Sequence, residues 1–227
     1  KERIHQAEQI AENRHVFRTY FHRPATIYTH LMLLKELLKD HEVILASGSP
    51  RRHRFMEQLE IPFKSDVRPI DEVFPKHLKG EAITAYLAKL KAEAFDDLAA
   101  RQILITSDTI VYLNEKAMGK PQDHAEAVQM ISALSGKKHE VISSVCFTTK
   151  NDQKTISFTT EVTFRQLERD EIEHYVATYK PFDKAGGYAI QEWIGLVGIT
   201  SITGSYFNVV GMPTHLVYTT LKEMLSQ

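Results

Sequence analysis

The sequence predicts an α/β fold in which a mixed, twisted sheet is flanked by helices. Apolar segments with the composition of buried strands alternate with segments of helical periodicity, beginning with EVILAS at 42–47 and a helical pattern from 50 to 59. Two strand-like segments, 140–149 and 154–164, flank the polar turn KNDQK and therefore predict a β-hairpin. Hydrophobic residues make up 43% of the 227 residues and charged residues 25%, which is ordinary for a globular domain.

Residues 1–40 form a region of their own at the start of the chain. KERIHQAEQIAENRHVF has a weak helical stripe of apolar residues, Pro24 interrupts the pattern, and 27–40 has the periodicity of an amphipathic helix. No motif that carries chemistry occurs in this region. We therefore expect a helical N-terminal extension of unknown role, followed by one domain over 41–227.

The first half of that domain contains a strand, a short helix and a long helix. Ser49 is placed to cap the helix that follows the first strand, and Pro50 fits the first position of that helix. FKSDV at 63–67 is a candidate strand. A long helix is expected from Glu81 to Ala100, because apolar residues recur on one side of this segment.

The second half alternates further strands and helices. QILITSD and TIVYLN have the composition of strands, and Asp123 with Glu126 resembles a capping box for a helix that Gly136 ends. ERDEIEHYVATY and THLVYTTLKEML are helical in pattern. Residues 183–213, between these two helices, are rich in glycine and are expected to be irregular.

The charge balance and the cysteine content restrict the classes of function. Lys plus Arg is 28, Asp plus Glu is 29 and the formal net charge is −1, so no bulk charge favours nucleic acid or a membrane surface. Cys146 is the one cysteine, lies in a predicted strand and fits a buried hydrophobic position. Without a disulfide framework or an apolar run long enough to cross a bilayer, we expect a cytoplasmic protein with no membrane partner.

The segment SGSPRR at 47–52 is the first candidate site. A helix begins there directly after a strand, so its free backbone N–H groups and its dipole favour an anion. Arginines in a first helical turn are unfavourable unless an anion faces them, and their guanidinium groups suit phosphate oxygens. Two interpretations stay open from this segment alone: phosphate binding by Arg51 and Arg52, or a solvated turn with two surface arginines.

Acidic residues form the second group of candidates. Asp108 ends the apolar run ILITSD, where α/β folds place ligand groups, and it can act as a general base or a metal ligand. Asp71 and Glu72 are adjacent in PIDEVFP, so we expect only one of them to serve a site that holds Mg²⁺ or Mn²⁺. Turn capping by Asp108 and an acidic surface turn are the alternatives.

Lysines and glycine-rich segments are weaker candidates. Lys89 and Lys91 lie on the predicted long helix and Lys120 lies in MGKP; taken alone, each is expected to be a solvated surface lysine. DKAGGYAIQEW and GSYFNVVGMP combine glycines with aromatic and amide side chains, which fits either a backbone that a ligand approaches closely or a plain loop. None of the 11 histidines forms HExxH, and GxSxG is absent, so neither a zinc site nor a serine-hydrolase site is expected.

Taken together, these segments resemble the Maf family of nucleoside triphosphate pyrophosphatases. The resemblance covers about residues 42–226 and rests on strings that occur in the family order: LASGSPRR, IDE, LAKLKA, SDTIV, GKP, ALSGKKHEV, VTFRQL, DKAGGYAIQ and GSYFNVVGMP. It implies two lobes around a central cleft, and a homodimer. It also implies hydrolysis of a nucleotide between its α and β phosphates, with a divalent metal cation, Mg²⁺ or Mn²⁺, as cofactor.

The resemblance also implies roles for individual residues. Asp108 is similar to the general base of the family, and Glu72, together with Asp108, is similar to the residues that hold the metal or its water. The positions that resemble triphosphate contacts are Ser49, Arg52, Lys91 and Lys120. The positions that resemble markers of the branch acting on dTTP and UTP are Arg51, Thr109 and Gln191, with modified pyrimidine nucleotides as further candidate substrates.

Two features depart from the family pattern. The glycine-rich loop usually reads AGAYGIQ and here reads AGGYAIQ, so Gly187 and Ala189 alter its expected shape while Gln191 is retained. Residues 1–40 have no counterpart in the family core. A nucleotide-sensing regulator of septum formation, without turnover, is the alternative function, and a nucleic-acid-binding protein is disfavoured by the nearly neutral charge.

Overall fold

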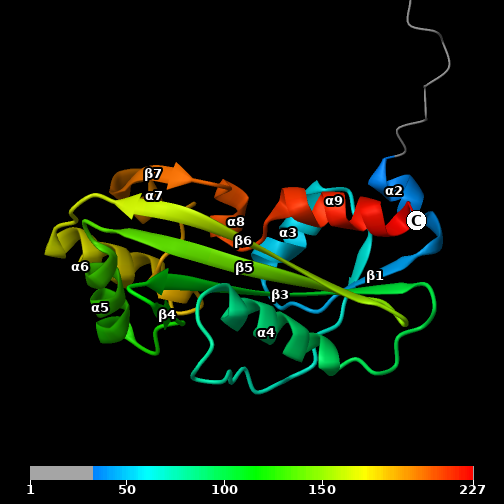
Figure 1. The fold of residues 1–227 in the computed structure, drawn as a ribbon. Coiled ribbons are helices and arrows are strands. Elements are labelled where there is room, and N and C mark those ends of the chain that lie inside the picture. The colour runs from blue at the N-terminus through cyan, green and yellow to red at the C-terminus, as the bar shows by residue number, and fades with distance from the viewer. Residues whose placement is uncertain (1–32, 227) are drawn as a thin grey trace, which may run out of the picture. The chain divides into compact units, whose positions relative to one another are not determined.

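The computed structural model describes residues 33–226 of the chain (Figure 1). These residues form a seven-stranded sheet in the order β2-β1-β3-β5-β6-β7, with β4 paired to β3 off this path. The strands are β1 (Glu42–Leu45), β2 (Phe63–Ser65), β3 (Gln102–Leu113), β4 (Lys116–Met118), β5 (Lys138–Thr148), β6 (Gln153–Phe164) and β7 (Ile199–Thr203). β1 pairs in parallel with β2 and β3, and the other pairs are antiparallel, so the sheet is mixed as predicted.

Helices cover both faces of this sheet. They are α2 (Leu34–Leu37), η1 (Leu38–Asp40), α3 (Pro50–Gln58), α4 (Glu81–Glu93), α5 (His124–Leu134), α6 (Arg169–Tyr179), η2 (Ala185–Gly187), α7 (Trp193–Gly198), α8 (Tyr206–Val210) and α9 (Thr214–Leu225). Figure 1 shows α4 on one face of the sheet and α3, α8 and α9 on the other. α5 and α6 contact each other at the end of the sheet away from the β5–β6 turn. The predicted α/β fold class is confirmed.

Two large hydrophobic cores divide the residues from 34 onward into two lobes. One core joins the second half of β3 to α5, α6 and α7, with Phe164 and Tyr175 among its fully buried side chains. The other joins α2, β1, α3 and the first half of β3 to α9, with Met56 and Phe147 fully buried. β3 and β5 contribute side chains to both cores, so these long strands connect the lobes.

Most predicted elements are present, and two helix starts have the expected capping residues. Ser49 occupies the N-cap of α3 and Pro50 its first turn, although the Ser49 side chain makes no capping hydrogen bond. At α5 the Asp123 side chain accepts a hydrogen bond from the N–H of Glu126 at 2.8 Å. The Glu126 carboxylate accepts from the N–H of Gln122 instead of Asp123, so the predicted capping box is only half formed.

The long helix is shorter than predicted, because α4 ends at Glu93 instead of running to Ala100. Phe95 turns into the core and is 6% exposed, and the guanidinium carbon of Arg68 lies 4.0 Å from its ring centroid. The same guanidinium donates to the carbonyl of Ala94 at 2.8 Å and so satisfies a group at the end of the helix. A contact from a distant segment therefore ends the helix, and periodicity does not reveal it.

The prediction that Asp108 ends a strand is wrong. β3 is one strand of 12 residues, and Asp108 pairs with Ser144 of β5 in its interior. Backbone groups form the hydrogen bonds between β3 and β5, so the polar side chains of 107–109 do not interrupt this strand pairing. β1 ends alongside instead, since its last residue Leu45 pairs with Ile105. Asp108 thus lies just beyond the carboxyl end of β1, at the kind of sheet edge where α/β folds bind ligands.

Residues 183–213 contain short regular elements instead of the expected irregular segment. η2, α7, β7 and α8 all fall in this range, and none is longer than the six residues of α7. Gly186, Gly204 and Gly211 adopt positive φ angles in or between these elements, which favours glycine. Elements this short do not repeat a helical or strand period often enough to be recognised in a sequence.

The first described helices pack on the lobe that contains α9. Leu34 and Leu38 are 1% and 3% exposed and belong to the same core as Leu221 of α9. The compact unit that they join begins at Leu34, ahead of the predicted domain boundary, which stays a prediction. α2 and η1 lie within the helix predicted at 27–40, and the helical patterns before residue 33 lie outside the described residues.

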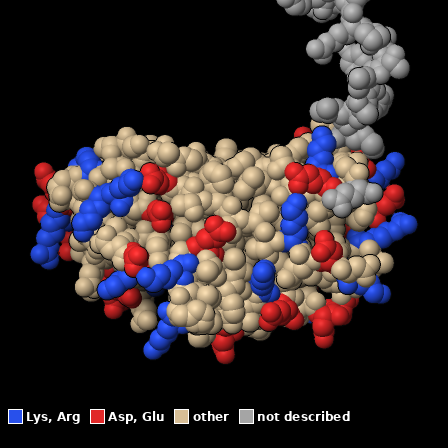
Figure 2. Space-filling model, in the orientation of Figure 1, with Lys and Arg blue, Asp and Glu red and all other residues tan. Residues whose placement is uncertain are grey.

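Charged side chains of both signs are mixed over the face of the molecule shown in Figure 2, in keeping with the formal net charge of −1. Cys146 is not on the surface but buried in β5, as predicted. Within residues 33–226, no helix has both the length and the apolar character needed to cross a membrane.

Candidate active site

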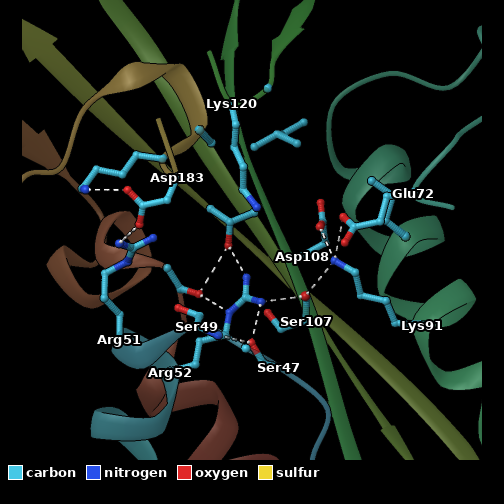
Figure 3. Close-up of a pocket in the computed structure, with 18 of the residues that line it drawn as sticks. Ser47, Ser49, Arg51, Arg52, Glu72, Lys91, Ser107, Asp108, Lys120 and Asp183 are labelled. Carbon is cyan, nitrogen blue, oxygen red and sulfur yellow. Dashed lines mark hydrogen bonds and ion pairs between the residues drawn. The ribbon is translucent and has the colours of Figure 1, made fainter. Parts of the chain in front are cut away.

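One cavity of about 790 Å³ is lined by the β1–α3 connection, α4, β3 and the glycine-rich segment before α7 (Figure 3). Residues of both lobes form its walls. Every residue to which the sequence analysis gave a site role lines it: Ser49, Arg51, Arg52, Glu72, Lys91, Asp108, Thr109, Lys120 and Gln191. The fold therefore gathers motifs that are far apart in the sequence, while the role of each residue stays a prediction.

Lys91 lies at the centre of the acidic part of the cavity (Figure 3). It comes from the last turn of α4, and its Nζ is 2.8 Å from Oδ1 of Asp108 and 3.0 Å from Oε2 of Glu72. The side chains of Lys91 and Asp108 are 16% and 10% exposed, whereas that of Glu72 is 52% exposed. Water therefore screens the attraction between Lys91 and Glu72 more than the attraction between Lys91 and Asp108.

Of the three carboxylates that line this cavity, that of Asp183 pairs with Arg51 and Lys184, and those of Asp108 and Glu72 are the predicted metal ligands. Both already converge on one cation, the ammonium of Lys91, and carboxylate oxygens suit Mg²⁺ or Mn²⁺. Among residues 33–226, no group of three or more His, Cys, Asp or Glu side chains is placed to hold a metal. The protein thus offers two ligands, which leaves the other positions of a metal for water and ligand oxygens.

The guanidinium of Arg52 is fixed in the protein by four hydrogen bonds. Nε donates to the carbonyl of Gly211 at 3.0 Å, and Nη1 donates to the carbonyl of Ser107 at 2.8 Å. Nη1 also donates to Oγ of Ser47 at 3.3 Å, and Nη2 donates to Oγ1 of Thr109 at 3.1 Å. Arg52 thereby connects α3 to the middle of β3 and to the segment after α8.

This fixation limits what Arg52 can offer a phosphate. Burial lowers the pKa of Arg52 from its ordinary value, and the negative charge of Asp108 opposes that shift. A guanidinium has five N–H groups, so four internal hydrogen bonds leave one N–H free for a ligand. Arg52 can therefore give one N–H and a positive charge, but not a two-pronged contact, unless its internal bonds rearrange.

Arg51 faces the glycine-rich segment instead of the acidic group (Figure 3). Its Nη1 is 3.3 Å from Oδ2 of Asp183, and Oδ1 of Asp183 accepts a hydrogen bond from Nζ of Lys184 at 2.7 Å. Partial burial acts to raise the pKa of Asp183, but the hydrogen bond from Lys184 and the charge of Arg51 hold it below its ordinary value. Arg51 and Asp183 thus form an ion pair across one side of the cavity.

The side chains of the remaining predicted residues differ in whether they form hydrogen bonds within the protein. Oγ1 of Thr109 lies 2.8 Å from Oγ of Ser143, and it also accepts the hydrogen bond from Arg52, so this hydroxyl is committed to the cavity wall. The side chains of Ser49, Lys120 and Gln191 contact no other described residue by a hydrogen bond or ion pair, and Lys120 and Gln191 are exposed. Those three side chains are free to contact a ligand.

Residues outside the predicted set also shape the cavity. Lys184 is 9% exposed and forms ion pairs with Asp183 and Glu192 at 2.7 and 3.4 Å. Glu192 in turn accepts a hydrogen bond from Tyr175 of α6 at 2.5 Å. Lys184 lies inside the string DKAGGYAIQ, so its place in this motif could have marked it as a residue of the cavity. Nothing in the sequence marks Tyr175, because its contact with Glu192 depends on how α6 packs against the glycine-rich segment.

An α/β fold whose cavity combines several cationic side chains with carboxylates is typical of the class of proteins that bind phosphorylated ligands. Within that class, the chain belongs to the Maf-like protein family, whose pattern matches residues 42–224. The resemblance that the sequence motifs indicated is therefore confirmed.

Relatives in this family are similar over nearly their whole length. The chain is 68% identical over 195 residues to the dTTP/UTP pyrophosphatase of Christiangramia forsetii, with 86% of this chain and 100% of the relative covered. It is 53% identical over 187 residues to the dTTP/UTP pyrophosphatase of Flavobacterium psychrophilum, with 82% and 96% covered. The corresponding protein of Phocaeicola vulgatus is 47% identical over 191 residues, with 83% and 99% covered.

Proposed function

We propose that the protein hydrolyses dTTP and UTP to the nucleoside monophosphate and pyrophosphate, by cleavage between the α and β phosphates. The observation that carries the proposal is the position of Asp108, which lines the cavity in contact with Lys91 and among six cationic side chains. The relatives named as dTTP/UTP pyrophosphatases support the same activity. They also disfavour the alternative of a nucleotide sensor without turnover.

The charges in the cavity fit a triphosphate that arrives with a divalent cation. Six cationic side chains line the cavity, namely Arg51, Arg52, Arg68, Lys91, Lys120 and Lys184, together with three carboxylates, namely Glu72, Asp108 and Asp183. The cavity lining therefore has a surplus of three positive charges, whereas a nucleoside triphosphate carries about four negative charges at neutral pH. A bound Mg²⁺ or Mn²⁺ would supply further positive charge, and Asp108 and Glu72 are the residues that we propose hold it.

Asp108 is the proposed general base. Its carboxylate can accept a proton from a water molecule that attacks a phosphorus atom in line with the leaving group. Lys91 orients this carboxylate through the contact at 2.8 Å, and a metal bound nearby would stabilise the charge that develops on the phosphate oxygens. The exposed Lys120 and the remaining N–H of Arg52 are the proposed contacts to the phosphate chain.

Gln191 is the proposed reader of the base. Uracil and thymine present an O4 acceptor beside an N3–H donor, and one carboxamide can pair with both groups. Arg51 and Thr109 complete the proposed specificity set, Arg51 through its ion pair with Asp183 and Thr109 as part of the wall. Modified pyrimidine nucleotides with the same O4 and N3–H edge remain candidate substrates.

The test is a panel of nucleoside triphosphates with Mg²⁺ or Mn²⁺, in which monophosphate and pyrophosphate are both quantified. The proposal expects equal amounts of the two products, with UTP and dTTP as the preferred substrates. Release of orthophosphate in place of pyrophosphate contradicts the cleavage position. Tight binding of UTP without any turnover supports the sensing alternative instead.

The proposal extends to assembly and surroundings. We propose a homodimer, to be checked by light scattering, and a cytoplasmic location, where nucleoside triphosphates are abundant. The net charge of −1 and the mixed surface charges give no reason to add nucleic acid as a partner.

A further inference from the structure

Residues on both sides of Gln191 contact one tyrosine of α6. Tyr175 is fully buried, and its Oη accepts a hydrogen bond from the N–H of Ala189 at 3.1 Å. The same hydroxyl donates to Oε2 of Glu192 at 2.5 Å. Ala189 precedes Gln191 and Glu192 follows it, so a single hydroxyl contacts the backbone before the proposed base reader and the side chain of the residue after it.

Backbone hydrogen bonds complete this fixation. The N–H of Glu192 donates to the carbonyl of Ala189 at 3.1 Å, which closes a turn around Gln191. The N–H of Gly195 donates to the carbonyl of Glu192 at 2.9 Å at the start of α7. The carboxamide of Gln191 contacts no other described residue by a hydrogen bond, so among these residues the fold acts on it through the position of the backbone from which it extends.

A series of charged side chains links the same turn to Arg51 of α3. The second carboxylate oxygen of Glu192 is 3.4 Å from Nζ of Lys184, which also contacts Asp183 at 2.7 Å. Asp183 in turn pairs with Arg51 at 3.3 Å. The charges alternate in sign along this chain, and the Lys184 side chain is only 10% exposed, so water screens its two ion pairs weakly.

We propose that Tyr175 and Glu192 are positioning residues that hold the backbone of Gln191 where its carboxamide can meet the O4 and N3–H edge of uracil and thymine, and thereby contribute to the preference for these bases over cytosine. A carboxamide that turns freely can satisfy either edge, because exchanging its N–H and C=O also matches the N4 donor and N3 acceptor of cytosine. Discrimination between the bases therefore requires that the backbone from which the Gln191 side chain extends stays in one position. This inference rests on the proposed base-reading role of Gln191.

The tyrosine is suited to a permanent donor role. Burial, reinforced by the hydrogen bond to Glu192, raises the pKa of Tyr175 well above its ordinary value. Its O–H therefore stays protonated over the whole working range of pH. The ring also stacks on Tyr179 with centroids 5.1 Å apart, and this stacking does not depend on the hydroxyl.

The experiment is a double-mutant cycle between Tyr175→Phe and Gln191→Ala, read as the ratio of kcat/KM for UTP to kcat/KM for CTP. Tyr175→Phe keeps the ring and removes only the hydroxyl, and it should lower the ratio by roughly 2- to 10-fold, the equivalent of one hydrogen bond. The loss should appear as a higher KM for UTP with kcat nearly unchanged. In the Gln191→Ala background, Tyr175→Phe should change the ratio no further.

Matched variants separate positioning from general damage. Tyr179→Phe removes the hydroxyl of the stacked neighbour on the same helix and should leave the ratio unchanged. Glu192→Gln keeps an acceptor for Tyr175 and should retain most of the preference, whereas Glu192→Ala should lower the ratio as Tyr175→Phe does. If Tyr175→Phe does not fold, as seen by thermal unfolding, the two Glu192 variants carry the same comparison.

Two results with the Tyr175 and Glu192 variants overturn the inference. One is an unchanged ratio in folded Tyr175→Phe and Glu192→Ala. The other is a drop caused by Tyr175→Phe that persists undiminished in the Gln191→Ala background, because the tyrosine then does not act through Gln191. If wild type hydrolyses UTP but Gln191→Ala leaves the ratio unchanged, this inference falls and the pyrophosphatase activity stands. Absence of turnover in the wild type instead removes the proposed function.

Discussion

The ammonium of Lys91 lies 2.8 Å from a carboxylate oxygen of Asp108 and on its other side is paired with Glu72 at 3.0 Å. The family resemblance assigns Lys91 to the phosphate chain and the two carboxylates to a metal. The structure places all three side chains in one cluster, so the proposed phosphate and metal contacts coincide in a single electrostatic centre. Changes at this centre should therefore affect both catalysis and cation binding.

Asp108→Asn should abolish turnover while the fold survives. The amide has the size of the carboxylate but cannot accept the proton of water, and general-base assistance is worth about 10²- to 10⁴-fold in rate. The measurement is kcat with UTP, together with thermal unfolding. Asp152→Asn, in the exposed turn of the hairpin, is the matched control and should keep full activity. A rate above about a tenth of wild type for Asp108→Asn would remove Asp108 from the base role.

Lys91→Met should separate the two roles of the lysine. Loss of a charge-assisted contact to substrate costs about 1.5–3 kcal/mol, so kcat/KM for UTP should fall roughly 10- to 150-fold. Without nucleotide, Mn²⁺ should bind more tightly than to wild type, because Asp108 and Glu72 no longer pair with an internal cation. Titration of the free protein with Mn²⁺, followed by electron paramagnetic resonance, measures this directly. Weaker Mn²⁺ binding would mean that Lys91 does not compete for the carboxylates.

Arg52→Ala should destabilise the folded protein as well as slow catalysis. The change removes the guanidinium hydrogen bonds to the carbonyls of Gly211 and Ser107, and loss of a hydrogen bond from a charged group costs about 1.5–3 kcal/mol. A chain of this size loses roughly 2–4 °C in Tm for each kcal/mol. Arg54→Ala, an exposed arginine on the same helix, is the control and should change neither stability nor kcat/KM. An unchanged Tm in Arg52→Ala would show that its four hydrogen bonds do not stabilise the fold.

His139 should make the stability depend on pH. It is 2% exposed, its Nδ1 has no partner among the described residues, and burial lowers its pKa from 6.5 to about 4. A lowered pKa means that protons bind the unfolded chain more readily, so the contribution of His139 is complete above pH 6.5 and is lost as the pH falls toward 4. Between pH 7 and pH 5 the free energy of unfolding should fall by about 2 kcal/mol on this account.

The check is denaturant unfolding at pH 7 and pH 5 in wild type, His139→Gln and His77→Gln. His139→Gln removes the buried titrating group, so its loss between the two pH values should be smaller than that of wild type by about 2 kcal/mol. His77 is exposed, and its replacement should leave the wild-type dependence intact. Equal pH dependence in all three proteins would assign the loss at low pH to other groups.

The motifs predicted which residues share the cavity, because a strand–turn–helix connection fixes its own local geometry. The approximate strands and helices followed from composition and period in the same way. What could not be predicted depends on contacts between distant segments. Arg68 ends α4 from outside that helix, and Tyr175 holds a turn in another part of the sequence. Asp108 was expected at the end of its own strand and lies instead beside the end of β1, a relationship that only strand pairing defines.

Two truncations should separate the described part of the predicted N-terminal extension from the rest. Leu34 and Leu38 are buried against the lobe that contains α9, and burial of a leucine side chain stabilises a fold by about 1.5–3 kcal/mol. Removing residues 1–33 should therefore keep Tm and kcat/KM for UTP, whereas removing 1–40 should lower Tm. The folded fraction of the second truncation should still turn over UTP at the wild-type rate, because among residues 33–226 the lining of the cavity begins at Ala46.

Point variants in the full chain test the same burial without deleting anything. Leu34→Ala and Leu38→Ala each leave a cavity beside α9 and should cost about 2–5 kcal/mol, while Leu33→Ala, at a side chain that is 49% exposed, should cost little. Light scattering alongside the kinetics shows whether either truncation changes association. If the protein without residues 1–33 stays folded, with its oligomeric state unchanged, and yet loses catalysis, the extension contributes to the active site. If removal of 1–40 leaves Tm unchanged, the packing of the two leucines does not stabilise the lobe.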